Sequence, residues 1–282
     1  MTPHNKALWQ VHLSTLLLAG NGFFAKKIAL NANDIIAMRG LMGASVLLIV
    51  ILLRGYSLRF HSRRHAPFML FLGAIMGVHW ITFFYSMQVA GVAAGMIALY
   101  SYPVFVVFMD PLLRGQRPHL QDILAAAAVF SGVCLMVPTF SLQDGATIGI
   151  AWGVFSAVLF AARNTLQRHF LQGYPGEVSM FWQGMAAGAV ALPFMTTSPL
   201  EISAQDWKLL VILAVFFTAM AHAFLASSLR VLKAKSTGLI SCLGPVYSVP
   251  IAWLTLGEVP STRTLLGGAI ILAAAAFETR RL

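Results

Sequence analysis

Charged residues are scarce in this chain and make up 10% of its 282 residues, whereas hydrophobic residues make up 59%. The mean hydropathy is correspondingly high, at +0.79. A chain of this composition would expose large apolar patches in water, so an ordinary soluble domain is excluded. The sequence therefore places the chain in a lipid bilayer.

Cysteines and metal-binding motifs are also nearly missing. Cys134 and Cys242 are the only cysteines and both fall in apolar segments, which excludes a disulfide framework. The eight histidines are scattered. No His-Glu-x-x-His motif places two imidazoles on one helix face, as a zinc protease requires. The sequence therefore predicts no enzyme activity, no metal site and no cofactor.

Long apolar stretches make up most of the chain. A helix needs about 20 mostly apolar residues to cross the hydrocarbon core of a bilayer. Ten such stretches with short connections use nearly the whole chain and leave no room for a soluble catalytic domain. The predicted spans are residues 8–28, 34–53, 66–87, 92–113, 120–139, 147–167, 178–197, 208–229, 236–256 and 262–278.

The distribution of basic residues predicts the orientation. In a soluble protein the net charge of +10 would suggest a nucleic-acid partner. Across ten spans, however, most of this charge collects on one side, which the positive-inside rule assigns to the cytoplasm. We expect a multi-pass protein of the cell inner membrane with both termini cytoplasmic and no nucleic-acid partner. The basic residues on that side are Lys6, Arg54, Arg59, Arg63, Arg64, Arg114, Arg117, Arg168, Arg230, Lys233, Lys235, Arg280 and Arg281.

The second half of the chain repeats the first. His79 and Gly95 are 16 residues apart, and His222 and Gly238 repeat this spacing 143 residues later. Five spans per repeat end on the opposite side of the membrane, so the second unit, 141–282, should be inverted relative to the first, 1–140. Inverted-repeat carriers hold their substrate between such units, which predicts a central cavity. Further matched pairs are Gly40 with Gly184, Pro103 with Pro245, Gly115 with Gly257, Pro118 with Pro260, and Gln116 with Glu258.

Two ordered motifs carry a family resemblance. Tyr102-Pro103 is followed by Leu-Arg-Gly-Gln-Arg, and Gly244-Pro245 is followed by Leu-Gly-Glu, which ends at Glu258. These motifs resemble the paired signatures of the drug/metabolite transporter superfamily, EamA type, and the whole chain is most similar to its YddG-type aromatic amino-acid exporters. The resemblance implies an all-α membrane protein of ten helices in two repeats. Gln116 departs from the family pattern, which usually has Glu there.

Two histidines are the strongest candidates for substrate contacts. His79 and His222 lie in the middle of spans and are related by the repeat. A neutral imidazole both donates and accepts a hydrogen bond, so each histidine either lines a pore or satisfies a backbone carbonyl or hydroxyl between helices. Phe83 shares the helical face of His79 because it follows four residues later.

Aromatic and amide side chains around these spans suit a pocket for a flat, partly polar solute. The alternative for each is ordinary helix packing or an interfacial belt. Arg39 lies well inside its span and is a candidate for attracting a substrate carboxylate. The other candidate substrate contacts are Asn21, Trp80, Tyr85, Tyr100, Trp182, Gln183, Ser241 and Tyr247.

Prolines are expected to kink two of the spans. Pro103 falls in the fourth predicted span, and Pro245 and Pro250 in the ninth. Proline removes a backbone donor and clashes with the preceding turn. The resulting kinks either create binding groups or a hinge, or they are fixed curvature.

Together these features favour a secondary transporter that exports small metabolites, with aromatic or apolar amino acids as the best substrate class. No carboxylate lies at mid-depth of a predicted span, so the usual acidic proton relay is missing. Export should follow the substrate gradient or couple weakly through histidine, and collapse of a pH gradient should barely change the flux. The alternatives are a multidrug or nucleotide-sugar-like carrier of the same superfamily, or a non-carrier channel or assembly factor.

Overall fold

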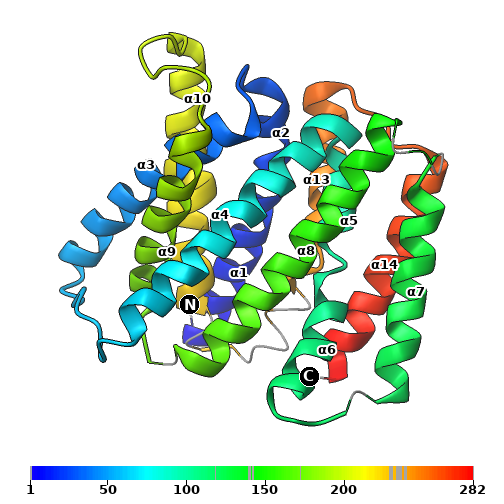
Figure 1. Cartoon of the computed structure of the whole chain (residues 1–282), viewed down its shortest axis with the longest axis horizontal. Coiled ribbons are helices and arrows are strands. Elements are labelled where there is room, and N and C mark those ends of the chain that lie inside the picture. Colours follow the sequence, from blue (N-terminus) through cyan, green and yellow to red (C-terminus); the bar gives the residue numbers. More distant parts are fainter. Residues whose placement is uncertain are drawn as a thin grey trace.

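The structure is a computed structural model that describes residues 2–117, 119–138, 141, 143–171, 173–228, 231–232, 237 and 240–281. Across these residues the chain forms helices and no strands (Figure 1), which confirms the all-α prediction. Several positions used in the sequence argument lie outside the described residues, namely Pro118, Arg230, Lys233, Lys235 and Gly238. The side chains of Arg280 and Arg281 lie outside them as well.

Each predicted span overlaps a helical element. The first half contains α1 (Pro3–Ala19), α2 (Asn21–Lys27), α3 (Ala32–Leu53), α4 (His65–Ala90), α5 (Val92–Leu99), α6 (Tyr102–Leu113) and α7 (Leu120–Met136). The second half contains α8 (Gly145–Phe170), α9 (Gly176–Ala191), η1 (Leu192–Phe194), α10 (Ala204–Ala214), η2 (Val215–Met220), α11 (Ala221–Ser228), α13 (Gly244–Leu256) and α14 (Thr262–Arg281).

Among the residues that the structure describes, five helices are long and apolar enough to cross a membrane. They cover Ala32–Leu53, His65–Ala90, Val92–Leu113, Gly145–Phe170 and Ala204–Leu225. Leu120–Met136 and Thr262–Phe277 are shorter apolar helices. Both ends of the chain lie in the lower half of Figure 1, on the side of the loop that joins α6 to α7.

Polar caps explain where several helices begin. The side chains of Asn31, Asp144 and Ser203 accept hydrogen bonds from backbone N–H groups three residues later, each at 3.0 Å. Such caps satisfy donors that a helix N-terminus leaves open, which matters more where water is scarce. The helices at Ala32, Gly145 and Ala204 therefore start at positions that the sequence dictates.

Two helices are interrupted at positions that the repeat relates. A turn at Tyr100 and Ser101 separates α5 from α6, and a turn at Cys242 and Leu243 precedes α13. Pro103 and the repeat-related Pro245 follow these turns at the start of the new helix. There a missing N–H costs no hydrogen bond, so the breaks lie just before the prolines. Pro250 lies inside α13, and the role of all three prolines as hinges stays a prediction.

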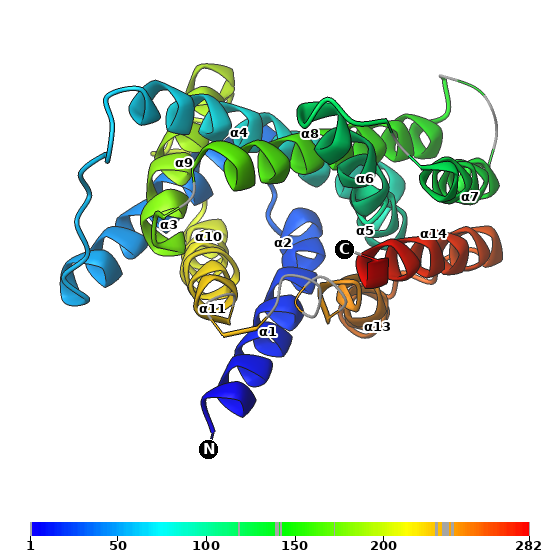
Figure 2. The ribbon, with the colours of Figure 1, turned by 90° about the horizontal axis from the view of Figure 1, so that it is seen from below.

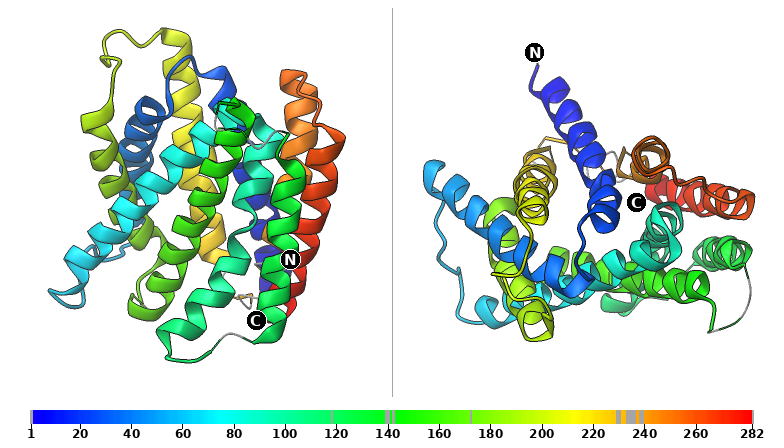
Figure 3. Two further views of the ribbon diagram at one scale, coloured as in Figure 1. Left: turned by 45° about the vertical axis from the view of Figure 1, so that its right-hand side comes forward. Right: turned by 90° about the horizontal axis from the view of Figure 1, so that it is seen from above.

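Helix contacts also follow the repeat. α3 packs on α9 and α7 packs on α14, so that each of these helices contacts its counterpart from the other half (Figures 2 and 3). The contact between α4 and α8 has its counterpart in that between α11 and α1. This pattern is the one that a two-fold relation between the halves would produce.

Glycines set the closest of these approaches. A Cβ atom added to Gly40 on α3 would lie 2.8 Å from the Cα of Gly188 and 3.0 Å from the carbonyl oxygen of Gly184, both on α9. A Cβ on Gly132 of α7 would lie 2.8 Å from the carbonyl oxygen of Gly267 on α14. Small residues let helix backbones meet closely in lipid, where dispersion contacts replace the hydrophobic effect.

A set of contacts around Glu258, which follows α13, joins the two halves. Its Oε2 accepts a hydrogen bond from the backbone N–H of Val92 at 2.8 Å, at the start of α5. Its Oε1 lies 3.5 Å from the Nζ of Lys26, which also donates to the carbonyl of Gln88 at 2.9 Å. Glu258 therefore acts as a helix cap across the halves as well as an ion-pair partner.

Substitutions of Glu258 should separate these two roles. Glu258→Gln keeps an acceptor for Val92 and should cost less than about 1 kcal/mol of folding stability, because the ion pair with Lys26 is partly exposed. Glu258→Ala also removes the cap and should cost about 1 to 2 kcal/mol. Thermal unfolding in detergent measures both, with the exposed Glu201→Ala as control. Equal losses in the Gln and Ala variants would show that the cap contributes nothing.

Candidate functional site

His79 lies in the interior between α4 and α8. It is 3% exposed, and its Nδ1 lies 2.7 Å from the Oγ and 3.1 Å from the carbonyl oxygen of Ser156. The Ser156 hydroxyl donates to the backbone carbonyl of His79 at 2.9 Å, so the hydrogen between the two side chains belongs to Nδ1. Hydrogen bonding between helices therefore accounts for one of the two ring nitrogens, Nδ1. The other nitrogen, Nε2, carries a lone pair that can accept a hydrogen bond.

Aromatic rings from both halves surround this imidazole. His79 stacks on Phe160 of α8 at 4.8 Å between ring centres and on Phe83 at 6.1 Å. Phe160 in turn meets Tyr102 edge-on at 4.9 Å, and Tyr102 lies 6.1 Å from Tyr100. Rings that present both faces and edges suit an aromatic or apolar ligand.

His222 makes a hydrogen bond within the second half and a ring contact with the first half. Its Nδ1 lies 2.7 Å from the carbonyl oxygen of Thr218, which can only accept, so Nδ1 carries the hydrogen here too. The ring meets Trp80 of α4 edge-on at 6.2 Å. Thr218 belongs to the π-helical segment η2, where its hydroxyl donates to the carbonyl of Leu213 five residues earlier at 2.9 Å. π-helical turns occur often at functional sites.

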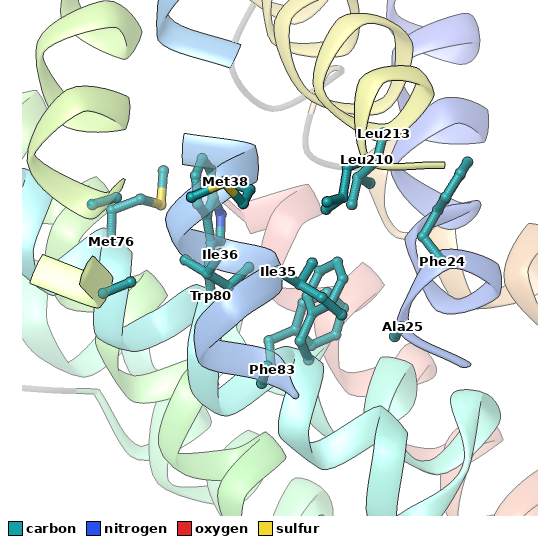
Figure 4. Packing of buried hydrophobic residues seen from close by; sticks show 14 of the residues in the cluster. Phe24, Ala25, Ile35, Ile36, Met38, Met76, Trp80, Phe83, Leu210 and Leu213 are labelled. Carbon is teal, nitrogen blue, oxygen red and sulfur yellow. The ribbon is translucent and has the colours of Figure 1, made fainter. Parts of the chain in front are cut away.

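Arg39 of α3 lies in the same region. Its Nε donates to the Oγ1 of Thr218 at 2.7 Å, and its guanidinium carbon stands 4.6 Å from the centre of the Trp80 ring. Trp80 is therefore in contact with both Arg39 and His222. Figure 4 shows Trp80 and Phe83 among the buried apolar residues of this core.

A second polar network lies on α8 and α9. Gln183 is fully buried and accepts a hydrogen bond from the Nε of Arg163 at 2.6 Å. Its amide nitrogen lies 2.9 Å from the Oγ of Ser179 and 3.0 Å from the Oε1 of Gln167. Arg39, Arg163 and His222 are all close enough to His79 to act on it electrostatically. The interior is therefore rich in positive charge and hydrogen-bond donors.

Two predicted contacts, Trp182 and Tyr85, lie apart from this cluster. Trp182 donates from its ring nitrogen to the carbonyl of Leu58 at 3.3 Å and packs on Phe60, so it fastens the segment between α3 and α4. Tyr85 is 40% exposed and meets Trp152 on the outside of α4 and α8.

The remaining predicted contacts lie on α2, α5 and α13 or next to them. Tyr100 is buried, with its hydroxyl against Gly244. The hydroxyl of Tyr247 lies 3.3 Å from the Nδ1 of His12, which links α13 to α1. Asn21 donates to the carbonyl of Leu18 at 2.8 Å, and its buried Oδ1 has no partner among the described residues. Ser241 is half-buried in the segment before α13.

The sequence analysis did not include Ser156, Phe160, Arg163 or Thr218 among the candidate contacts. Ser156, Phe160 and Arg163 follow each other at intervals of four and three residues, so they share one face of α8. That spacing was the available signal. Thr218 precedes His222 by four residues and lies on its face in the same way.

One cavity of about 350 Å³ lies away from the cluster, near Glu258. Ala90, Ala94, Met136, Ile150 and Thr264 are among the residues that line it, and none of the predicted site residues does. Within the described part of the chain, no three His, Cys, Asp or Glu residues are grouped so that they could hold a metal ion.

The comparison with known families agrees with this architecture. The EamA-like transporter family matches residues 5–137 and again residues 147–279. The chain belongs to the EamA-like transporter family. The resemblance to the EamA type is thereby confirmed, and the two matched regions correspond to the two halves that contribute side chains to the interior cluster. The chain is a multi-pass membrane protein of a family of transporters, and neither the family nor its relatives are enzymes.

Relatives of this EamA-like transporter include exporters of different molecules. It is 25% identical to the pseudopaline exporter CntI of Pseudomonas aeruginosa over 87% of this chain and 85% of that protein. It is 29% identical to a probable terminal-alkyne amino-acid exporter of Streptantibioticus cattleyicolor over 68% of this chain and 65% of that protein. A solved crystal structure that is 18% identical, with a TM-score of 0.68, covers 99% of this chain and 100% of that one, and so shares its fold.

Proposed function

We propose that this EamA-like transporter is a secondary carrier that exports aromatic or apolar amino acids across the cell inner membrane. The observation that carries the proposal is the interior cluster. His79 and Trp80 from the first half meet Phe160, Thr218 and His222 from the second half in one place. Each imidazole offers an Nε2 acceptor beside aromatic rings, which suits a ligand with one ammonium group and one apolar side chain.

Export would proceed by alternating access. Residues 1–140 and 141–282 act as two inverted five-helix repeats that rock about the cluster, with both termini in the cytoplasm. The repeat-related helix contacts and the matching turns before Pro103 and Pro245 support this arrangement. Because the cluster draws residues from both halves, rocking changes the distances between its members and so its affinity on the two sides.

The energy source is the substrate gradient itself. Carboxylates are engaged at helix ends, where Asp34 accepts from the backbone of Thr196 at 2.9 Å and Asp206 from that of Ala29 at 3.0 Å. Glu258 likewise accepts a hydrogen bond from the backbone N–H of Val92. Among the described residues, the interior cluster contains histidines and arginines but no carboxylate that could relay protons.

The test is uptake of labelled amino acids into proteoliposomes, with and without a proton gradient. We expect saturable, stereoselective uptake of phenylalanine, tryptophan or leucine, with initial rates that change less than about twofold when the pH gradient is collapsed. Empty liposomes and the exposed variant His4→Leu serve as controls. Flux that does not saturate would indicate a channel, and a large loss on collapse would contradict gradient-driven export.

A broader carrier for other metabolites is the second candidate, because one relative is named for the export of pseudopaline. The same proteoliposomes distinguish the two. Competition by unlabelled drugs or nucleotide sugars, with no competition by amino acids, would favour the second candidate.

A further inference from the structure

Arg39 carries a buried charge that the fold leaves incompletely paired. Its side chain is 1% exposed and is the largest of the fully buried side chains among the described residues. One nitrogen, Nε, donates to Thr218 at 2.7 Å. Another, Nη1, is buried without a hydrogen-bond partner among the described residues. A guanidinium has five donors in a planar fork, so this one retains capacity for a planar acceptor.

No carboxylate in the described part of the chain neutralises this charge. The ion pairs there join Lys26 to Glu258 and Arg54 to Glu177, both away from Arg39. Asp34, five residues earlier on the same helix, accepts instead from Thr196 and Asn31. An isolated buried charge is strongly unfavourable, which makes a missing counter-charge the simplest explanation of the site.

The surroundings hold the guanidinium in place without neutralising it. The rings of Trp80 and Phe84 stand 4.6 and 5.0 Å from its central carbon, and their faces attract a cation. Thr218 fixes Nε through a hydroxyl whose own hydrogen goes to Leu213. The fork is therefore oriented in advance, as a receptor for a carboxylate requires.

The neighbouring groups strengthen the case for an anion. His222 shares Thr218 and Trp80 with Arg39, and Arg163 contributes a second positive charge to the interior. The Nε of Arg163 is bonded to the neutral amide of Gln183 and its Nη1 to that of Asn164. An interior with two guanidinium groups and no acid among its described members favours ligands with a negative group.

We propose that Arg39 is the substrate carboxylate-binding residue of this transporter, with Trp80 holding the guanidinium in the orientation that receives the two carboxylate oxygens. This inference rests on the proposed function and deepens it, because it makes a free carboxylate an obligatory feature of the substrate. The apolar part of the ligand would then lie towards Phe83 and Phe160. Amines and esters of the same shape would bind weakly, since they leave Arg39 unpaired.

Binding of three probes to the purified protein tests the inference. Phenylalanine has both charged groups, 3-phenylpropionate has only the carboxylate, and phenylethylamine has only the ammonium group. Ligand-dependent thermal shift and tryptophan fluorescence should show binding of the two carboxylates, with phenylethylamine weaker by roughly 10- to 100-fold. Equal binding of phenylethylamine and phenylalanine by the unmodified protein would overturn the proposal without any substitution.

Variants then assign the preference to one residue. Arg39→Gln should abolish it, and Arg39→Lys should restore part of it because the charge returns without the planar fork. Arg63→Gln, which removes an exposed charge between α3 and α4, should leave the preference unchanged. If Arg39→Gln does not fold, Thr218→Val should still weaken carboxylate binding, because it removes the acceptor that orients Nε. A folded Arg39→Gln variant, or a folded Thr218→Val variant used in its place, with the full carboxylate preference would contradict the assignment.

The outcome is separable from that of the proposed function. Carboxylate binding that depends on Arg39, without flux in proteoliposomes, would refute export but support Arg39 as the carboxylate-binding residue. Amino-acid flux with an unchanged apparent affinity in Arg39→Gln would refute the role of Arg39 in carboxylate binding but support export.

Discussion

Gly40→Ala should destabilise the protein, whereas Gly184→Ala at the repeat-related position should not. The added Cβ on Gly40 would meet backbone atoms of Gly188 at 2.8 Å, which is closer than real Cβ contacts allow. On Gly184 it would lie 3.5 Å from the carbonyl oxygen of Gly40 and 3.6 Å from the Cβ of Ala44, which is ordinary contact. Backbone cannot move aside as a flexible side chain can, so α3 and α9 must separate in the first variant only.

The expected loss for Gly40→Ala is about 1 to 3 kcal/mol from overpacking, and Gly40→Leu should prevent folding altogether. Gly184→Ala should be neutral or slightly stabilising, because alanine is the better helix former. Thermal unfolding in detergent and the monodisperse fraction after solubilisation measure both. A reversed order, with Gly184→Ala the less stable variant, would show that α3 and α9 do not cross at these glycines.

The helices were predictable because lipid imposes one strong requirement, a run of about 20 apolar residues that satisfies its own backbone. That requirement predicted where helices lie, including 34–53, for which the structure has Ala32–Leu53, whereas the count of ten membrane spans stays a prediction. It did not predict the interruption at Tyr100 and Ser101, because apolar composition continues unbroken through it. Nor did it predict the π-helical segment. There the hydroxyl of Thr218 donates a hydrogen bond to the carbonyl five residues earlier and accepts one from Arg39, which is 179 residues away in the chain.

The candidate site could be predicted only where residue type and position on a helix face determine which side chains belong to it. His79 and Phe83 were chosen together because they share a helix face, and the structure stacks them. Tyr85 was chosen for its aromatic ring, yet six residues of helix turn it about 240° from His79, towards the outside. Trp182 was chosen in the same way and packs near a loop. The bond of His79 to Ser156 spans 77 residues and depends on how α4 meets α8.

His79→Leu should reduce transport at least tenfold, by roughly the value of a hydrogen bond to a charged group, while the amount of folded protein stays near that of the unmodified chain. Leucine fills similar space against Phe160 but has no Nε2 acceptor. Folding should persist because the Ser156 hydroxyl keeps its bond to the backbone carbonyl of residue 79. His222→Leu should behave alike, since it removes the acceptor that the second half supplies.

The readout that separates a transport role from a folding role is the ratio of initial flux to folded protein, compared with His4→Leu on the exposed N-terminal segment. His79→Gln should recover part of the flux, because its amide can replace one hydrogen bond. The flux of Ser156→Ala should lie between those of the unmodified protein and His79→Leu, since this substitution frees the ring of His79 without removing it. If flux and folded protein fall together in His79→Leu and in His222→Leu, the two imidazoles serve packing between the halves, and the substrate contacts must lie elsewhere.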